Sequence, residues 1–324
     1  MKTGSFDQLL DHNSEAENPI TFKQYYWMDS EFAAGPDAPI LFHICGEGAV
    51  DQSYMLSDSS IEFAKILGAQ VVFLEHRYYG KSQPFLDLSS DHLKYLTLNN
   101  VIEDLAVFQK WLTAKEKLKG KWIAMGGSYA GTIAAYYRYK HPELVVGSLA
   151  SSALMHLFSD IEPWNEPDLF GARNIEISKN YTIGFRQFTF EECTILGGTG
   201  YAWAGRPDLN NMLAPSAEVC KDFYGVTKPV EVDAFNSVFF DPFVTDSPDS
   251  ASNILFTNGT NDSFSFVGIR PDNNKNPRIN TFLITDGSHH SDLGTQTSDD
   301  PIASKSIDDA YSMFLELAKK WLSE

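Results

Sequence analysis

Short apolar runs, typical of buried strands, alternate along the chain with longer stretches in which apolar residues recur every three or four positions, as in helices. The runs predict strands at 21–28, 39–44, 70–75, 122–125, 144–149, 253–257 and 281–285. The periodic stretches predict helices at 57–67, 98–118, 132–140 and 304–322. Strands that alternate with helices and are apolar throughout form parallel sheets with helices on both faces. The pattern therefore predicts an α/β fold.

The alternation is interrupted between residues 155 and 252. This part is rich in Pro, Gly, Asn and Asp, and its aromatic clusters at 185–190 and 233–243 follow no regular period. A long irregular segment inside a compact protein is usually a functional insertion such as a lid. We therefore expect a core formed by residues 1–154 and 253–324, with a short cap region at 155–252 between its two parts.

The first candidate for chemistry is Ser128, which stands between the strand expected at 122–125 and the helix expected from residue 132. In the stretch Gly126-Gly-Ser-Tyr-Ala130, the residues two positions before and after the serine are both small. This arrangement is typical of a nucleophile elbow, in which a serine sits on a strained turn at the edge of the sheet. A glycine-rich turn with an incidental serine is the alternative, because the short motif alone is weak.

Two further candidates follow the ends of later strands. Asp262 comes after the strand at 253–257, and His289 comes after the strand at 281–285. The carboxyl ends of parallel strands meet at one edge of a sheet, and the order Ser, acid, His is that of α/β-hydrolases. His289 would accept the proton of Ser128, and Asp262 would orient the imidazole.

Neighbouring side chains offer alternatives for two of these roles. His290 could replace His289, and Asp286 or Asp292 could replace Asp262. An aspartate in a turn rich in Asn and Gly is often only a turn former, so each assignment depends on the whole constellation.

A glycine-rich loop, Gly46-Glu-Gly48, follows the strand at 39–44. We expect this loop, through Gly46 or Glu47, and the N–H of Tyr129 to supply the two donors that a developing oxyanion needs. A carboxylate beside that oxyanion would repel it, so the side chain of Glu47 is expected to turn away toward a cation. That cation would be Arg77 or the free amino group of a peptide substrate, and a solvated Glu47 without a partner is the third interpretation.

The charge of the chain narrows its partners. With 25 Lys and Arg against 43 Asp and Glu, the formal net charge is -18, which disfavours nucleic acids and anionic membranes. No apolar run approaches the roughly 18 residues needed to cross a bilayer. No signal peptide precedes Phe6, so we expect a mature or trimmed form. Neither a cofactor nor a metal ion is expected, and three N-glycosylation sequons begin at Asn180, Asn258 and Asn261.

Five stretches together resemble one family of serine peptidases, that of prolyl carboxypeptidase and dipeptidyl peptidase II. They are Phe6–His12, Leu74–Ser82, Gly126–Gly131, Asn258–Asp262 and His289–Asp292. The resemblance implies an α/β-hydrolase fold, Ser128, Asp262 and His289 as the catalytic triad, and cleavage of peptides next to proline. It also implies a lysosomal, secreted or periplasmic protein, for which a homodimer is one possible assembly.

The resemblance extends to further residues. It implies a disulfide between Cys193 and Cys220, which would leave Cys45 free. Thr132 and Phe264 stand where family members carry residues that line the proline pocket, although the residue types differ here. The large helical cap of the family is mostly missing.

Two other functions are compatible with these residues. A triad does not specify the acyl group, so an esterase or lipase on the same fold is one alternative. A binding protein that lost turnover together with its cap is the other.

Overall fold

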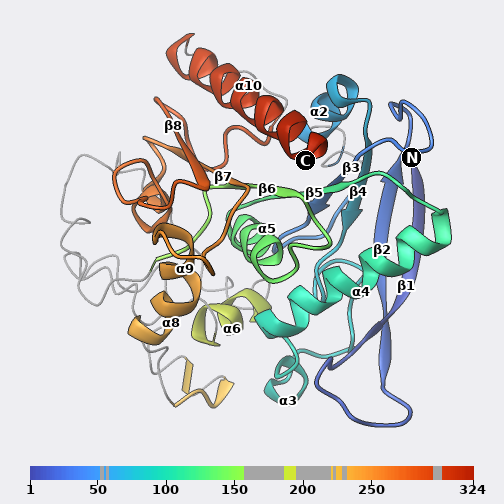
Figure 1. Cartoon of the computed structure of the whole chain (residues 1–324). Helices are drawn as coiled ribbons and strands as arrows, with labels where there is room; N and C mark the ends of the chain where they lie inside the picture. The colour runs from blue at the N-terminus through green and yellow to red at the C-terminus, as the bar shows by residue number, and fades with distance from the viewer. Residues whose placement is uncertain are drawn as a thin grey trace.

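The computed structural model describes residues 1–51, 55, 58–156, 186–194, 220–221, 224–227, 232–294 and 301–324. An eight-stranded sheet crosses the molecule in the order β1-β2-β4-β3-β5-β6-β7-β8 (Figure 1). β2 pairs antiparallel with both β1 and β4, whereas all other neighbouring strands are parallel. The predicted α/β architecture with a mostly parallel sheet is confirmed.

The element bounds agree with most of the predicted ones. The strands are β1 Lys2–Leu9, β2 Thr21–Asp29, β3 Ile40–Ile44, β4 Gln70–Leu74, β5 Trp122–Gly127, β6 Gly147–Ser151, β7 Ile254–Gly259 and β8 Ile279–Ile284. The long helices are α2 Ser59–Leu67, α4 Leu98–Glu116, α5 Tyr129–Lys140 and α10 Pro301–Ser323. Shorter helical segments are α3 Ser90–Leu93, α6 Arg186–Thr194, α8 Val232–Phe239, α9 Asp241–Val244 and the 3-10 helix η2 Ser263–Val267.

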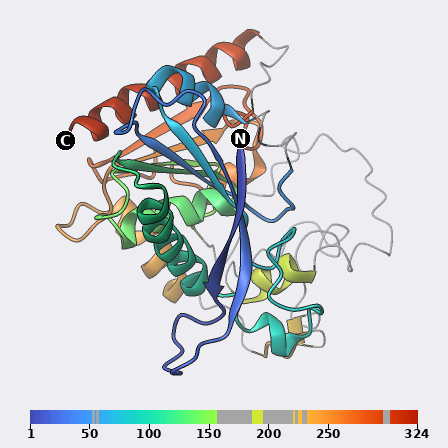
Figure 2. The same ribbon diagram turned by 90° about the vertical axis from the view of Figure 1, so that its right-hand side faces the viewer.

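Each face of the sheet is covered by its own pair of long helices (Figures 1 and 2). Successive side chains of a strand point to opposite faces. Phe42 and Ala124 therefore pack beneath α4 and α5, whereas their neighbours Leu41 and Ile123 pack beneath α2 and α10. Strands buried on both faces explain why the apolar runs were nearly continuous.

The edge strand β1 was not predicted. Its residues are mostly exposed, and of the two that are buried, Phe6 and Gln8, one is polar. Gln8 donates a hydrogen bond to Gln24 Oε1 across the β1–β2 pair, at 2.9 Å. Because one of its two buried positions holds an amide and not an apolar side chain, β1 lacks the alternation of apolar and polar residues that predicts a strand.

The strand expected at 144–149 lies further along the chain, as β6. Val145 is buried, but its carbonyl oxygen accepts a hydrogen bond from Arg138 Nη1 at 2.6 Å instead of joining the ladder of the sheet. The apolar residue therefore closes the end of α5 and does not begin the strand. Helix α5 in turn begins at Tyr129, three residues before the predicted start.

Most of the predicted cap region, residues 155–252, lies outside the described residues, so the proposed division into core and cap stays a prediction. One described part, α6, carries Cys193, which forms a disulfide with Cys220 as predicted. Cys45 is a buried free thiol. Tyr79 Oη donates to Glu191 Oε2 at 2.6 Å, which ties α6 to the loop after β4. In the described part of the chain, no helix is long and apolar enough to cross a membrane.

The disulfide can be tested directly. We expect a non-reduced digest to yield one peptide pair joined through Cys193 and Cys220, and Cys45 to react with an alkylating agent only after denaturation. A bridge that closes a loop of this length stabilises the folded state by about 3 kcal/mol in the chain-entropy model. Mass spectrometry that found three free thiols in the oxidised protein would contradict the pairing.

Candidate active site

Ser128 occupies a strained turn between β5 and α5. Its backbone has φ 58° and ψ -130°, a region that residues other than glycine rarely adopt. The Ser128 N–H donates to the carbonyl oxygen of Ser151 at 2.9 Å, which fixes the turn against β6. The structure therefore has the geometry of the predicted nucleophile elbow.

Small residues are required around this turn. A Cβ added at Gly126 would lie 2.5 Å from the carbonyl oxygen of Ala130 in the helix. A Cβ at Gly127 would lie 2.7 Å from Leu293 Cδ1 and 3.1 Å from His290 Cβ, in the loop that follows β8. The elbow thus touches its own helix on one side and the histidine loop on the other. We use the name histidine loop for residues 285–294.

Asp262 and His289 meet at the carboxyl edge of the sheet. Asp262 follows β7 and caps η2, where its Oδ1 accepts the Phe264 N–H at 2.9 Å. Its Oδ2 lies 2.9 Å from His289 Nδ1. Burial raises the pKa of the Asp262 carboxyl, but hydrogen bonds from His289, Ser152 and Phe264 outweigh it, so this pKa lies below its ordinary value. An ionised Asp262 accepts the Nδ1 proton and leaves His289 Nε2 free to act as a base.

No hydrogen bond joins Ser128 to His289 in the described residues. Such bonds are often long in a free enzyme and tighten when substrate binds. The three side chains nevertheless come from the same edge of the sheet.

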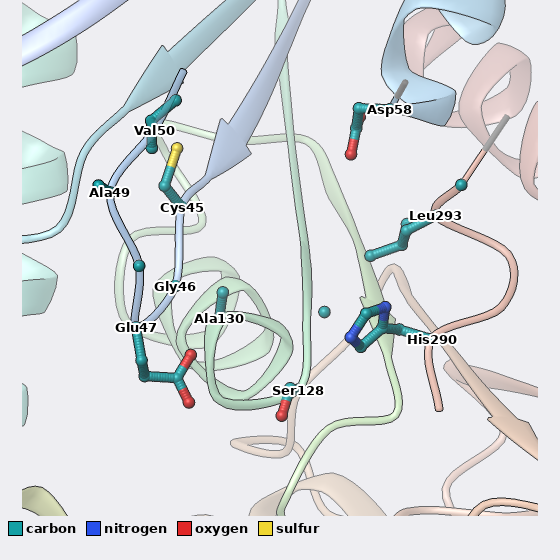
Figure 3. Close-up of a pocket in the computed structure, with 13 residues that line it drawn as sticks. Cys45, Gly46, Glu47, Ala49, Val50, Asp58, Ser128, Ala130, His290 and Leu293 are labelled. Carbon is teal, nitrogen blue, oxygen red and sulfur yellow. The ribbon is translucent and has the colours of Figure 1, made fainter. Parts of the chain in front are cut away.

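The structure distinguishes between the alternatives for the acid and the base. His290 does not bond to Asp262; its ring faces a pocket beside Ser128 (Figure 3). Asp292 is buried, and both of its oxygens accept hydrogen bonds from hydroxyl groups of Ser151 and Thr257. His290 therefore does not take the place of His289 as the partner of Asp262, and Asp292 does not take the place of Asp262 as the partner of His289.

The pocket beside Ser128 has a volume of about 340 Å³. The loop Gly46–Val50 forms one wall, and His290 with Leu293 forms the opposite one (Figure 3). The carboxylates of Glu47 and Asp58 both line this pocket. A pocket of this size next to a nucleophile can hold a side chain of a substrate.

The loop expected to complete the oxyanion hole lies against the elbow. A Cβ at Gly46 would lie 3.5 Å from the Cβ of Ala130. The Gly48 N–H donates to the Gly46 carbonyl at 2.9 Å, so it is already used within the loop. Tyr129 is fully buried at the start of α5, where N–H groups lack partners within the helix. The N–H of Tyr129 and one N–H of Gly46 or Glu47 thus stay the predicted pair of donors.

Glu47 does not turn away as expected. Its half-buried carboxylate extends toward the same end of the pocket as the Ser128 hydroxyl (Figure 3). Burial raises the pKa of Glu47 to about 7, although its own backbone N–H and the nearby His289 act in the opposite direction. Glu47 is therefore not fully solvated, and none of the described residues forms an ion pair with its carboxylate.

The predicted pairing of Arg77 with Glu47 is wrong, as is a substrate-binding role for Arg77. The buried guanidinium donates through Nε and Nη2 to the two oxygens of Asp104, each at 2.6 Å. Its remaining N–H groups donate to the carbonyl oxygens of Leu9, Leu10 and Tyr95. All five donors are thus used within the protein.

Thr132 was also expected to contact substrate, and this prediction is wrong. The side chain is buried in α5, and its Oγ1 donates to the Leu154 carbonyl at 3.0 Å and accepts the Leu154 N–H at 2.9 Å. Phe264, in contrast, is exposed, and its ring centroid lies 4.9 Å from that of His289. Of these two side chains, Phe264 is the one exposed beside His289.

Sequence reasoning missed Ser152, which follows β6. Its φ of 48° is unusual for serine, and its Oγ accepts the His290 N–H at 2.9 Å. The available signal was the pair Ser151-Ser152 at the end of the strand next to the one that leads into Ser128. Among the described residues, no group of His, Cys, Asp or Glu side chains is arranged to hold a metal ion.

Comparison with known proteins identifies the family of the chain. The model of the family "Serine carboxypeptidase S28" matches residues 8–167 and 173–307. The chain belongs to this family. Its S28 membership confirms the resemblance seen in the sequence, which covered both ends of the chain.

Curated relatives match over about half of the chain. The thymus-specific serine protease of Mus musculus is 35% identical over 167 residues, which cover 51% of this chain and 33% of that protein. The lysosomal Pro-X carboxypeptidase of Bos taurus is 39% identical over 150 residues, covering 44% and 30%. The serine protease vicPa of Bipolaris victoriae is 34% identical over 174 residues, covering 51% and 32%. The matched part spans about a third of the length of these relatives.

A solved esterase structure from Pyrococcus furiosus shares the fold. It aligns with 99% of this S28 chain and 91% of its own chain at a TM-score of 0.52, with 14% sequence identity. Together with the strand order, this confirms the predicted α/β-hydrolase fold.

The corrected role of Arg77 gives a prediction about stability. We expect Arg77→Lys to lower the free energy of unfolding by on the order of 3 kcal/mol, because an ammonium cannot replace the bidentate contact to Asp104 and the three carbonyl contacts. The Arg270→Lys variant is the matched control, since the Arg270–Asp272 pair is partly exposed and should contribute little. Denaturant unfolding measures both. An unchanged stability of Arg77→Lys with altered substrate affinity would restore the binding role.

Proposed function

We propose that this chain is a serine peptidase that cleaves peptide bonds through an acyl-enzyme. The observation that carries the proposal is the Asp262–His289 hydrogen bond at the same sheet edge as the strained Ser128. Membership of the S28 family supports peptides, and not other acyl compounds, as substrates.

Each side chain has one task in the proposed reaction. His289 Nε2 takes the proton of Ser128 Oγ as this oxygen attacks the carbonyl carbon of the peptide bond. The oxyanion accepts hydrogen bonds from the Tyr129 N–H and from one N–H of Gly46 or Glu47. His289 then gives its proton to the leaving amine, and a water molecule releases the acyl group by the reverse proton transfers. Asp262 stabilises the imidazolium at both stages.

We also propose a preference for bonds next to proline. Its support is the exposed ring of Phe264 beside His289, since an aromatic face packs well on a pyrrolidine ring, and the printed name of the Bos taurus relative. Because Thr132 is buried away from the pocket, Phe264 would carry this preference without it.

We propose a lysosomal or secreted location. The Cys193–Cys220 disulfide supports an oxidising compartment, as does the lysosomal relative. Of the three sequons, Asn258 is buried and donates to the Ile269 carbonyl, so it cannot carry a glycan in the folded protein. Asn261 is exposed, and Asn180 lies outside the described residues.

The nucleophile and the acid can be tested together. We expect Ser128→Ala to abolish labelling by a fluorophosphonate and hydrolysis of a prolyl peptide, with unfolding unchanged. Asp262→Asn should lower turnover by about 10⁴-fold, because the imidazole loses its correct tautomer. The Asp286→Asn variant is the matched control for the acid, since Asp286 is exposed in the histidine loop and Asn tolerates its positive φ.

Several outcomes would contradict this assignment. A folded Ser128→Ala protein that kept its turnover would exclude Ser128 as the nucleophile, and equal losses in the two aspartate variants would exclude Asp262 as the specific acid. A wild-type protein that hydrolysed p-nitrophenyl esters but no peptide would be an esterase. A wild-type protein without any labelling would be the binding protein considered above.

The position of Glu47 predicts a substrate with a free amino group. A carboxylate with a pKa of about 7 is negative above that pH and neutral below it. We therefore expect the ratio of kcat/KM for free-amine peptides to kcat/KM for blocked peptides to fall as the pH drops through about 7, because the triad acts alike on both peptide types.

The Glu47→Gln variant isolates this effect. It should raise KM for free-amine peptides by about tenfold, the loss of one charged contact, and should leave KM for acetylated peptides unchanged. Steady-state kinetics on paired free and acetylated peptides, at about two pH values per pH unit from pH 5 to 9, measure the pH dependence and the change in KM. Equal changes for both peptide types would mean that Glu47 does not read the amine.

A further inference from the structure

Asp292 is a buried carboxylate that the proposed mechanism does not use. It lies in the histidine loop, three residues after His289, and only 2% of its surface is exposed. Its Oδ1 accepts the hydroxyl of Ser151 at 2.5 Å, and its Oδ2 accepts the hydroxyl of Thr257 at 2.7 Å. Both oxygens therefore point toward strands β6 and β7.

The two hydroxyl groups form one cradle. Ser151 at the end of β6 and Thr257 in β7 are direct partners in the parallel pairing of these strands. Their side chains therefore stand next to each other on the same face of the sheet. A carboxylate has two oxygens at a fixed separation, so it can accept one hydroxyl from each strand at the same time. The position of Asp292 is thus fixed in two directions.

A second contact fixes the loop closer to the catalytic base. Ser152 Oγ accepts the N–H of His290, and the Ser152 N–H donates to the Thr257 carbonyl at 2.7 Å. The same Ser152 hydroxyl also stabilises the ionised form of Asp262. His289 therefore lies between the carboxylate of Asp262, which holds its ring, and an anchored backbone that begins at the next residue.

Burying this carboxylate is costly for stability. Burial raises the pKa of Asp292, although hydrogen bonds from Ser151 and Thr257 act against this. An apolar residue of similar size would avoid the cost of removing a charge from water, as replacements of buried ionic groups often do. Two charge-assisted hydrogen bonds do, however, define a position far more sharply than apolar packing.

We propose that Asp292 is a positioning residue, which clamps the histidine loop onto Ser151 and Thr257 and so keeps His289 in register with Asp262 and Ser128. The inference rests on the proposed triad, and it assigns to the β6–β7 strand ends a role in the reaction. It differs from the view that Asp292 is an alternative catalytic acid, because the carboxylate does not touch His289.

The test compares substitutions at both ends of the clamp. Asp292→Ala removes the carboxylate, Asp292→Asn keeps its shape and one acceptor, and the double variant Ser151→Ala/Thr257→Val removes both donors while leaving Asp292 in place. Ser306→Ala is the matched control, since Ser306 Oγ accepts the Thr285 N–H at 2.9 Å and anchors the first residue of the same loop. Thermal unfolding reports the stability of each variant.

Three readouts separate positioning from a general loss of stability. The first is the rate at which a fluorophosphonate labels Ser128, the second is kcat and KM for a prolyl peptide, and the third is the downfield proton resonance of the His289 Nδ1–H bonded to Asp262. A displacement of about 1 Å can cost about 10²-fold in rate. We expect that loss in labelling and kcat for Asp292→Ala and for the double variant, with KM unchanged and the Nδ1–H resonance broadened or lost.

The conservative variant and the control sharpen the result. Asp292→Asn should recover part of the rate, with a loss of about tenfold, because its amide oxygen still accepts one hydroxyl. Ser306→Ala should lower the unfolding temperature without changing the labelling rate or the resonance.

The proposal is overturned if folded Asp292→Ala keeps the wild-type labelling rate and resonance, or if Ser306→Ala reduces both as strongly. If Asp292→Ala does not fold, the double variant decides on the same readouts. Failure of the proposed function would give a different result from failure of the positioning role. Wild-type protein would then resist the fluorophosphonate, and the Nδ1–H resonance alone, compared between wild type and the clamp variants, would decide whether Asp292 positions His289.

Discussion

The close packing of helix α5 onto the end of β5 is the constraint on which the catalytic edge depends. There is no room for a Cβ at Gly126, because the carbonyl oxygen of Ala130 lies where it would be. The chain must therefore turn within one residue, and Ser128 takes the strained conformation at the apex. The strain is held by the hydrogen bond from the Ser128 N–H to Ser151, at the end of the neighbouring strand. The strand end that holds the proposed nucleophile also holds the histidine loop, through the side chains of Ser151 and Ser152.

Buried charges are handled in two different ways in this structure. The Arg77 guanidinium uses two donors on Asp104 and three on backbone carbonyl oxygens, and so joins the N-terminal hairpin to α4. This is an ion pair whose partners neutralise each other, and its role is structural. At the catalytic edge, Asp262 and Asp292 are instead stabilised mainly by hydrogen bonds from neutral groups and from His289. The pKa of Asp262 lies below its ordinary value, as suits a carboxylate that holds a catalytic base, whereas burial raises the pKa of Asp292, whose oxygens stay directed at Ser151 and Thr257.

In the proposed function, Glu47 connects the electrostatics of the site to the choice of substrate. Its carboxylate lies in the pocket next to Ser128, and burial brings its pKa into the physiological range. When neutral, it does not oppose the oxyanion; when negative, it attracts a cation into the pocket. The charge state of this one side chain can therefore separate substrates with a free amino group from those without one, while the triad chemistry stays the same.

The sequence by itself determined the sheet, its long helices and the order of Ser128, Asp262 and His289 at strand ends, because hydrophobic periodicity and turn residues are local properties. It could not reveal β1, whose inward positions include the amide of Gln8. Nor could it show that Arg77 pairs with Asp104, that Thr132 bonds to Leu154, or that Asp292 meets Ser151 and Thr257. These partners lie between 22 and 141 residues apart in the chain. Only the tertiary structure decides such contacts, because a buried polar group bonds to whichever group the packing brings beside it. Hydrophobic periodicity does not identify that partner.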